Sequence, residues 1–182
     1  MEDLQYPIGK FKWDGSASGE QLRQWIDEIA AAPALLRAAV DGLSPEQVDT
    51  PYRPGGWTIR QLVHHVPDSH LNSYMRIRLA LTEQEPTIKP YDEKRWAELP
   101  DSRSAPLEVS LSLLESLHAR WVLLLRALTA DDWKRTYRHP ELGVVNLERT
   151  AALYAWHGRH HVAHITSLRQ RMEWTRRAGH GL

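Results

Sequence analysis

Hydrophobic residues recur every three or four positions along most of the chain, whereas the period-two alternation of strands is nearly absent. This pattern predicts helices. We expect the first long helix over residues 18–42, with Gly42 at its end and a kink at Pro33. Its apolar stripe consists of Leu22, Trp25, Ile26, Ile29, Leu36 and Val40.

Two capping signals follow this segment. Ser44, Pro45 and Gln47 have the spacing of a short helical turn that is closed by a capping box. Thr58 and Gln61 form the same signature, so we expect the second long helix to begin directly after the threonine. Its apolar face is made of Ile59, Leu62, Val63, Val66, Tyr74, Ile77 and Leu81.

The residue pattern in the second half of the chain predicts one long connection and two more helices. Residues 82–106 contain four prolines and no sustained periodicity, which indicates a long ordered loop. A third helix is expected from Pro106. Residues 137–146 are rich in turn signals and compatible with a short strand or a hairpin. Asn146 can cap a fourth helix that runs to about Met172.

Four long helices with one long connection are typical of a helix bundle. The sequence therefore predicts an all-α four-helix bundle with a long ordered loop between helices two and three. At 182 residues the chain fits a single domain over residues 1–182.

The composition restricts the expected binding partners and the expected metal ligands. Lys+Arg and Asp+Glu are both 23 and no basic block occurs, which argues against a nucleic-acid partner. The N-terminus does not resemble a signal peptide, and residues 121–128, the most apolar stretch, are too few to cross a bilayer. We therefore expect a cytoplasmic protein without a membrane partner. Because the chain has no cysteine, imidazole and oxygen are the expected metal ligands.

Four of the ten histidines lie within residues 157–164. At 100° per residue, all four share an arc of roughly 100° on one face of the fourth helix. Two imidazoles four residues apart can reach one metal ion, and both His157/His161 and His160/His164 have this spacing. The alternative is a set of core or interface histidines, or a solvated polar face.

A third ligand would favour a metal site. The expected donor is in the second helix, where His64 and His65 lie 100° apart, so that only one of them can face the cluster. His65 continues into a polar stripe with Ser69, Asn72 and Arg76, which favours it over His64. The same stripe is also compatible with the solvent-exposed face of an amphipathic helix.

The remaining histidines show no ligand spacing. His70 lies on the apolar face of the second helix and is expected to be a hydrogen-bonded core residue. His118, His139 and His180 have no partners at ligand spacing, so they are expected at the surface.

The segments "GGWTIRQLVHHVPDSHLNSYMRIRLALTE" and "YAWHGRHHVAHI", with "KPYDEKRWAEL" between them, resemble the DinB-like superfamily. The similarity is to its YfiT-type proteins, described as metal-dependent hydrolases and related to bacillithiol transferases, and it covers nearly the whole chain. The resemblance implies a four-helix bundle, a homodimer and one divalent ion per subunit, zinc or nickel, held by three histidines.

Matched to the family motif, the resemblance implies His65, His157 and His161 as metal ligands. The first follows a tryptophan by eight positions, and the other two match the helical pair of the family. Many superfamily members have an "RGQ" triplet where this chain has Val162, Ala163 and His164. His164 is therefore a candidate acid/base, and the pair His160/His164 stays an alternative ligand pair.

Three neutral imidazoles would leave the charge of a divalent ion uncompensated, so the ion lowers the pKa of bound water to about 7 and ionises a bound thiol. One reading is a hydrolase that uses metal-bound hydroxide. The other is an S-transferase for a low-molecular-weight thiol of the bacillithiol type, which the resemblance favours. A chain without cysteine requires the thiol to arrive as a cosubstrate beside the small-molecule substrate, and Arg76 is then expected to orient its carboxylates. A metal-binding helical dimer without turnover is the third hypothesis.

Overall fold

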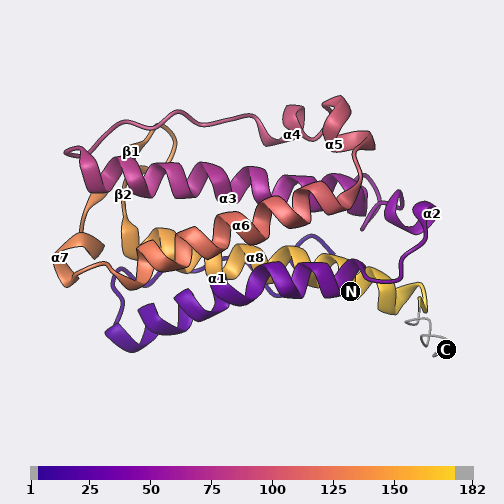
Figure 1. The fold of residues 1–182 in the computed structure, drawn as a ribbon, viewed down its shortest axis with the longest axis horizontal. Coiled ribbons are helices and arrows are strands. Elements are labelled where there is room, and N and C mark those ends of the chain that lie inside the picture. The colour runs from indigo at the N-terminus through magenta and orange to yellow at the C-terminus, as the bar shows by residue number, and fades with distance from the viewer. Residues whose placement is uncertain (1–3, 175–182) are drawn as a thin grey trace.

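The structure is a computed structural model, and it describes residues 4–174. Four long helices occupy the four predicted segments and confirm the predicted four-helix bundle (Figure 1). They are α1 (Gly19–Val40), α3 (Ile59–Thr82), α6 (Leu107–Arg126) and α8 (Leu147–Arg171).

The predicted caps explain where these helices begin. The Thr58 hydroxyl accepts a hydrogen bond from the Gln61 backbone amide at 3.2 Å, and the Gln61 side chain accepts one from the Thr58 amide at 3.0 Å. The short helix α2 (Pro45–Val48) has the predicted capping box at Ser44, and Asn146 caps α8. Each cap satisfies amides that a helix start leaves without an intrahelical partner.

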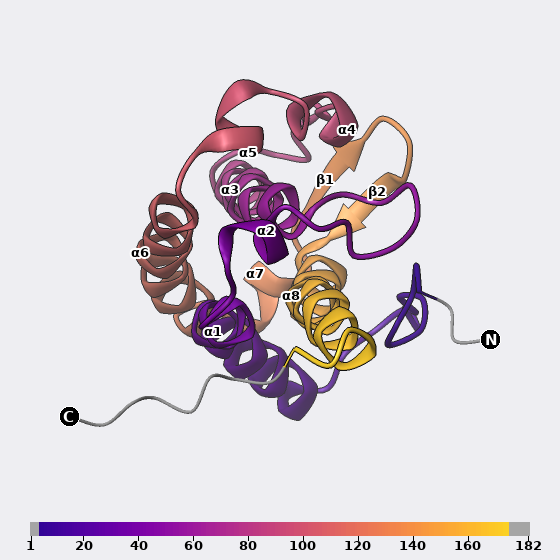
Figure 2. The ribbon, with the colours of Figure 1, turned by 90° about the vertical axis from the view of Figure 1, so that its right-hand side faces the viewer.

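The four long helices form a ring in which α1 packs against α6 and α8, and α3 packs against the same two helices (Figure 2). In Figure 1, α3 and α6 run in one direction and α1 and α8 in the other. This arrangement is possible because the long connection returns along the outside of α3 before α6 begins. That connection therefore covers one side of the bundle.

The connection carries secondary structure that periodicity did not predict. It contains α4 (Glu93–Trp96), which the Asp92 side chain caps, and α5 (Pro100–Ser104). The buried Gln61 side chain donates to the Ala97 carbonyl at 2.9 Å and fixes the connection to α3.

A two-stranded hairpin closes one end of the bundle. The short helix α7 (Ala130–Trp133) precedes it, and its antiparallel strands are β1 (Thr136–His139) and β2 (Gly143–Asn146). The Ile88 amide donates to the Arg138 carbonyl at 3.0 Å, so the long connection also pairs with this hairpin. Of the two alternatives expected over residues 137–146, a short strand or a hairpin, the structure has the hairpin.

Two apolar clusters fill the bundle. One contains Ile29, Trp121 and Tyr154, and the other contains Leu36 and Ile165. Along α3, the buried His70 lies between the residues that contribute to the two clusters, and its ring contacts the buried His118 of α6. A polar layer of imidazoles therefore interrupts the core halfway along the bundle.

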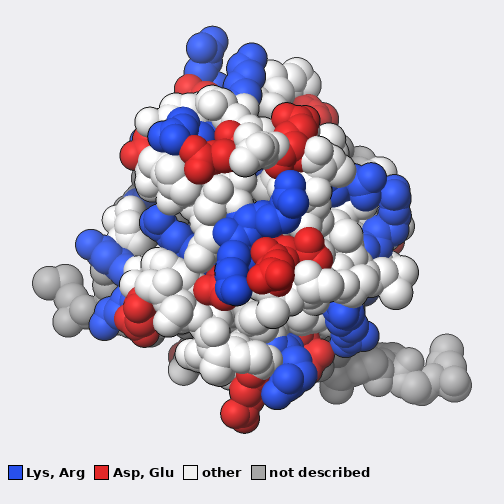
Figure 3. Space-filling view, turned by 90° about the vertical axis from the view of Figure 1, so that its left-hand side faces the viewer, with Lys and Arg blue, Asp and Glu red and all other residues white. Residues whose placement is uncertain are grey.

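The surface carries charges of both signs. On the end of the molecule with α7 and the hairpin, Lys and Arg side chains are interspersed with Asp and Glu (Figure 3). Within residues 4–174, no helix is long and apolar enough to span a membrane.

Candidate metal centre

Three imidazoles from two helices converge in the polar layer. The His157 Nε2 atom lies 3.1 Å from His161 Nε2 and 3.4 Å from His65 Nε2. One ligand nitrogen from each ring lies within 4.8 Å of the other two. The spacing of four residues along α8 supplies the pair, and α3 supplies the third ring across the bundle.

The structure places the two neighbouring histidines of α3 on different sides. His64 is buried away from the cluster, where its Nδ1 atom lies 2.7 Å from the Ser110 hydroxyl and its Nε2 atom 3.2 Å from the Ala105 carbonyl. His65 points to the cluster and packs its ring against Trp57, with 4.7 Å between the ring centroids.

A second group of histidines follows on α8. One nitrogen each from His160, His161 and His164 also lies within 4.8 Å of the others. However, His164 Nε2 already lies 3.1 Å from the Gln5 carbonyl, and the His160 ring stacks on Trp156 at 4.3 Å. The Nδ1 atoms of these three histidines are buried without a hydrogen-bond partner among the described residues.

The first group fits a divalent ion by the chemistry of its donors. Burial lowers the pKa of His65 to about 4. Burial, followed by the charge of neighbouring imidazoles, lowers the pKa of His157 and His161 well below the usual value. The rings are therefore neutral near pH 7, and neutral imidazole is the form that binds a metal. The His157 Nε2 atom lies close to two other Nε2 atoms, and its single lone pair or single proton can satisfy only one of them, whereas a cation between the rings would bind all three lone pairs.

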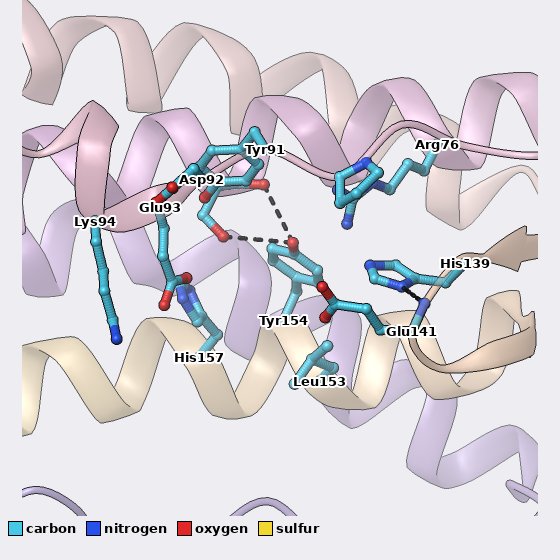
Figure 4. Close-up of a pocket in the computed structure, with 12 residues that line it drawn as sticks. Arg76, Tyr91, Asp92, Glu93, Lys94, His139, Glu141, Leu153, Tyr154 and His157 are labelled. Atoms are coloured by element: carbon cyan, nitrogen blue, oxygen red, sulfur yellow. Dashed lines mark hydrogen bonds between the residues drawn. The ribbon is translucent and has the colours of Figure 1, made fainter.

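Two cavities meet at this group. The first has a volume of about 810 Å³ and runs along α3 and α8 past Ser69, Arg76 and Tyr154 (Figure 4). The second has a volume of about 680 Å³ and is lined by the remaining histidines of the group and by His164. Three residues line both cavities: Glu93, Lys94 and His157. His157 is thus reached from both cavities, whereas His65 and His161 line the second cavity alone.

Arg76 projects from α3 into the first cavity, close to the hairpin residues His139 and Glu141 (Figure 4). Within residues 4–174, no acceptor forms a hydrogen bond with its guanidinium group. Its planar array of donors is therefore available to an anion in the cavity.

Two expectations for isolated histidines are wrong. His118 was expected at the surface, but its exposed fraction is 2% and its ring contacts His70. His139 was also expected at the surface, but it is buried on β1 and lines the first cavity. His70 is a hydrogen-bonded core residue, as predicted. His180 lies outside the described residues.

The sequence profile of the DinB superfamily matches residues 28–165. The chain belongs to the DinB superfamily. The chain is 57% identical over 174 residues to a Bacillus cereus protein named "Putative metal-dependent hydrolase", covering 96% of this chain and 100% of the relative. A Bacillus mycoides protein of the same kind is 56% identical with the same coverage.

Solved structures agree with this assignment. YfiT from Bacillus subtilis, described as "a probable metal-dependent hydrolase with an unusual four-helix bundle topology", has a TM-score of 0.92 and 51% identity over 94% of this chain and 99% of its own. This chain is thus of the YfiT type. The four-helix bundle protein TT2238, at 19% identity and a TM-score of 0.56, shares the fold.

Proposed function

We propose that this protein is a divalent-metal-dependent enzyme in which the Nε2 atoms of His65, His157 and His161 hold one zinc or nickel ion per subunit. The convergence of these three atoms and the names of the relatives support the assignment. As the family resemblance implies, we expect the functional unit to be a homodimer.

The reaction we propose is the transfer of a low-molecular-weight thiol, of the bacillithiol type, to a small electrophile. The observation that carries this choice is the pair of cavities that meet at His157. A transferase must hold two organic molecules beside one centre, whereas a hydrolase needs one molecule and water. When bound, a divalent ion supplies the Lewis acidity that favours the deprotonated thiol.

Arg76 and His164 then have distinct roles. Arg76 has free donors in the first cavity, so it binds and orients a carboxylate of the thiol. His164 lines the second cavity, and its Nε2 atom donates to the Gln5 carbonyl, which can only accept. The neutral ring therefore keeps a lone pair on Nδ1, and we propose that this ring assists proton transfer to the leaving group in the second cavity.

In this transfer the thiol sulfur forms a bond to the electrophilic carbon, and the bond from that carbon to its leaving group breaks. The leaving group departs with the electron pair of that bond. The thiol proton passes to solvent or to the leaving group. No oxidant or reductant is required.

Hydrolysis is the second candidate, and the names of the relatives favour it. In that reaction water replaces the thiol, and only one cavity needs an organic occupant.

The two candidates are separated by one set of assays on zinc-loaded protein. Bacillithiol, cysteine and glutathione are each incubated with a chlorinated electrophile, and an ester and amide panel is tested in parallel, with metal-free protein and His157→Ala as controls. We expect thiol consumption above both controls, and an increase in the KM for the thiol in Arg76→Ala that Arg76→Lys reverses in part. Metal-dependent ester or amide hydrolysis without thiol consumption would replace the transferase proposal with the hydrolase.

A further inference from the structure

A line of buried imidazoles leads away from the candidate metal centre into the core. The His157 Nδ1 atom lies 3.0 Å from His70 Nε2, and His70 Nδ1 lies 2.7 Å from His118 Nε2. The line ends where His118 Nδ1 lies 2.6 Å from the Ile29 carbonyl oxygen. It connects α8, α3, α6 and α1, which are all four long helices of the bundle.

The carbonyl at the end of the line determines where each proton lies. A carbonyl oxygen only accepts, so His118 carries its proton on Nδ1. When His118 is neutral, its Nε2 atom is a lone pair, and His70 must donate from Nδ1. The Nε2 atom of His70 is then also a lone pair, and it accepts from His157 Nδ1. All three rings therefore have the same tautomer, with the proton on Nδ1.

Burial keeps this line neutral. His70 is fully buried at 0% exposure, and His118 is exposed by 2%. Among the described residues, no carboxylate forms a hydrogen bond with either ring. Trp121 packs edge-on against both rings, with centroid distances of 5.8 Å to His70 and 5.4 Å to His118. A cation in this position would be desolvated without a counter-charge, which is costly. Burial also lowers the pKa of His118 to about 4.

We infer that His70 and His118 are positioning residues that fix His157 as the Nδ1–H tautomer, so that its Nε2 lone pair faces His65 and His161 for metal binding. This inference rests on the proposed ligand set. The carbonyl of Ile29 in α1 thereby sets the protonation state of a ligand in α8 through two intervening rings. Partners of this kind orient ligands and increase their basicity.

The direct test is the tautomer of His157 in the metal-free protein, read from long-range ¹H–¹⁵N spectra of the histidine rings. We expect the wild type to show a proton on Nδ1 of His157, His70 and His118. In His118→Leu, His70 loses its acceptor, and we expect His157 to become a mixture of the two tautomers. His118→Gln is the matched control, because the amide oxygen of glutamine can accept from His70 and should restore the wild-type pattern.

Zinc affinity provides the second readout, measured by competition with a chromophoric chelator. We expect His118→Leu to bind zinc about 10–100-fold more weakly than the wild type, and His118→Gln to bind it nearly as tightly. Circular dichroism in chelator checks that each variant is folded. A role of His118 in core packing alone would lower the stability of both variants and leave the tautomer of His157 unchanged.

The outcomes separate this inference from the proposed function. A wild type that binds no zinc refutes the ligand set, and the spectrum of His157 still decides the inference. A proton on Nε2 of His157 in the wild type overturns it. Wild-type zinc affinity together with an unchanged His157 tautomer in folded His118→Leu would overturn it as well.

Discussion

Acidification should strongly destabilise the metal-free protein, because buried histidines that are neutral in the folded state become protonated on unfolding. Burial lowers the pKa of His65 to about 4 and that of His118 to about 4, from an ordinary value of 6.5. Each ring binds fewer protons when folded than when unfolded. The stabilisation associated with each neutral buried ring is therefore fully present above the pKa of the unfolded state. It is lost as the pH falls from about 6.5 towards the folded pKa of about 4.

The two pKa values set the size of the effect. Between about pH 7.5 and pH 5, linkage gives a loss of about 2 kcal/mol for each ring, and about 4 kcal/mol for the pair. This is a large part of the roughly 5–15 kcal/mol by which a domain is usually stable. His70, His157 and His161 change the free energy in the same direction, because burial lowers their pKa values too.

Urea unfolding followed by circular dichroism, in chelator at several pH values across this range, measures the loss. The matched variant is His118→Gln, which removes one titrating ring. Loss of the hydrogen bond from His118 to the Ile29 carbonyl lowers the free energy of unfolding at every pH, so the change in this difference with pH isolates titration. We expect its loss on acidification to be smaller by about 2 kcal/mol. A free energy of unfolding that stays constant from about pH 7.5 to pH 5 in the wild type would refute this reasoning.

Three further predictions concern stability. Saturating zinc should raise the melting temperature of chelator-treated protein by about 5–10 °C, because ion at a hundredfold excess over Kd adds about 2.7 kcal/mol. Because burial lowers the pKa of His65 to about 4, this gain should fade as the pH falls towards that value and the folded ligands protonate. Thr58→Ala removes the capping hydroxyl of α3, so urea unfolding should show a loss of about 1 kcal/mol. Gly158→Val should cost about 1–3 kcal/mol, because a Cβ atom there would lie 3.0 Å from the Ala32 Cβ atom where α8 meets α1; unchanged melting would contradict this close contact.

The helices could be predicted from sequence because their causes are local. Thr58 and Gln61 form a capping box whatever the rest of the chain does, and the apolar stripe of α3 follows from its own spacing. The clustering of histidines on one face of α8 follows from helical geometry in the same way. The position of His65 near His157 needed one more piece of information, the polar stripe that favoured it over His64.

The line of imidazoles could not be predicted because it depends on how four helices pack. His118 has no ligand spacing to any other histidine in the sequence. Its position between Leu114, Trp121 and Leu125 on the buried face of α6 was a signal of burial, and that signal was missed. His139 lies two residues after the buried Tyr137 and therefore on the same face of β1, which is the corresponding signal for a strand. Neither pattern identifies the partner across the bundle.

The central claim is that one divalent ion is held by His65, His157 and His161, and elemental analysis of purified variants tests it most directly. His160 and His161 are adjacent on α8 and equally buried at 7% exposure, so they form a matched pair. We predict one ion per chain in the wild type and in His160→Ala, and loss of the ion in folded His161→Ala. Full occupancy in His161→Ala with loss in His160→Ala would contradict the claim and move the site to the His160/His164 pair.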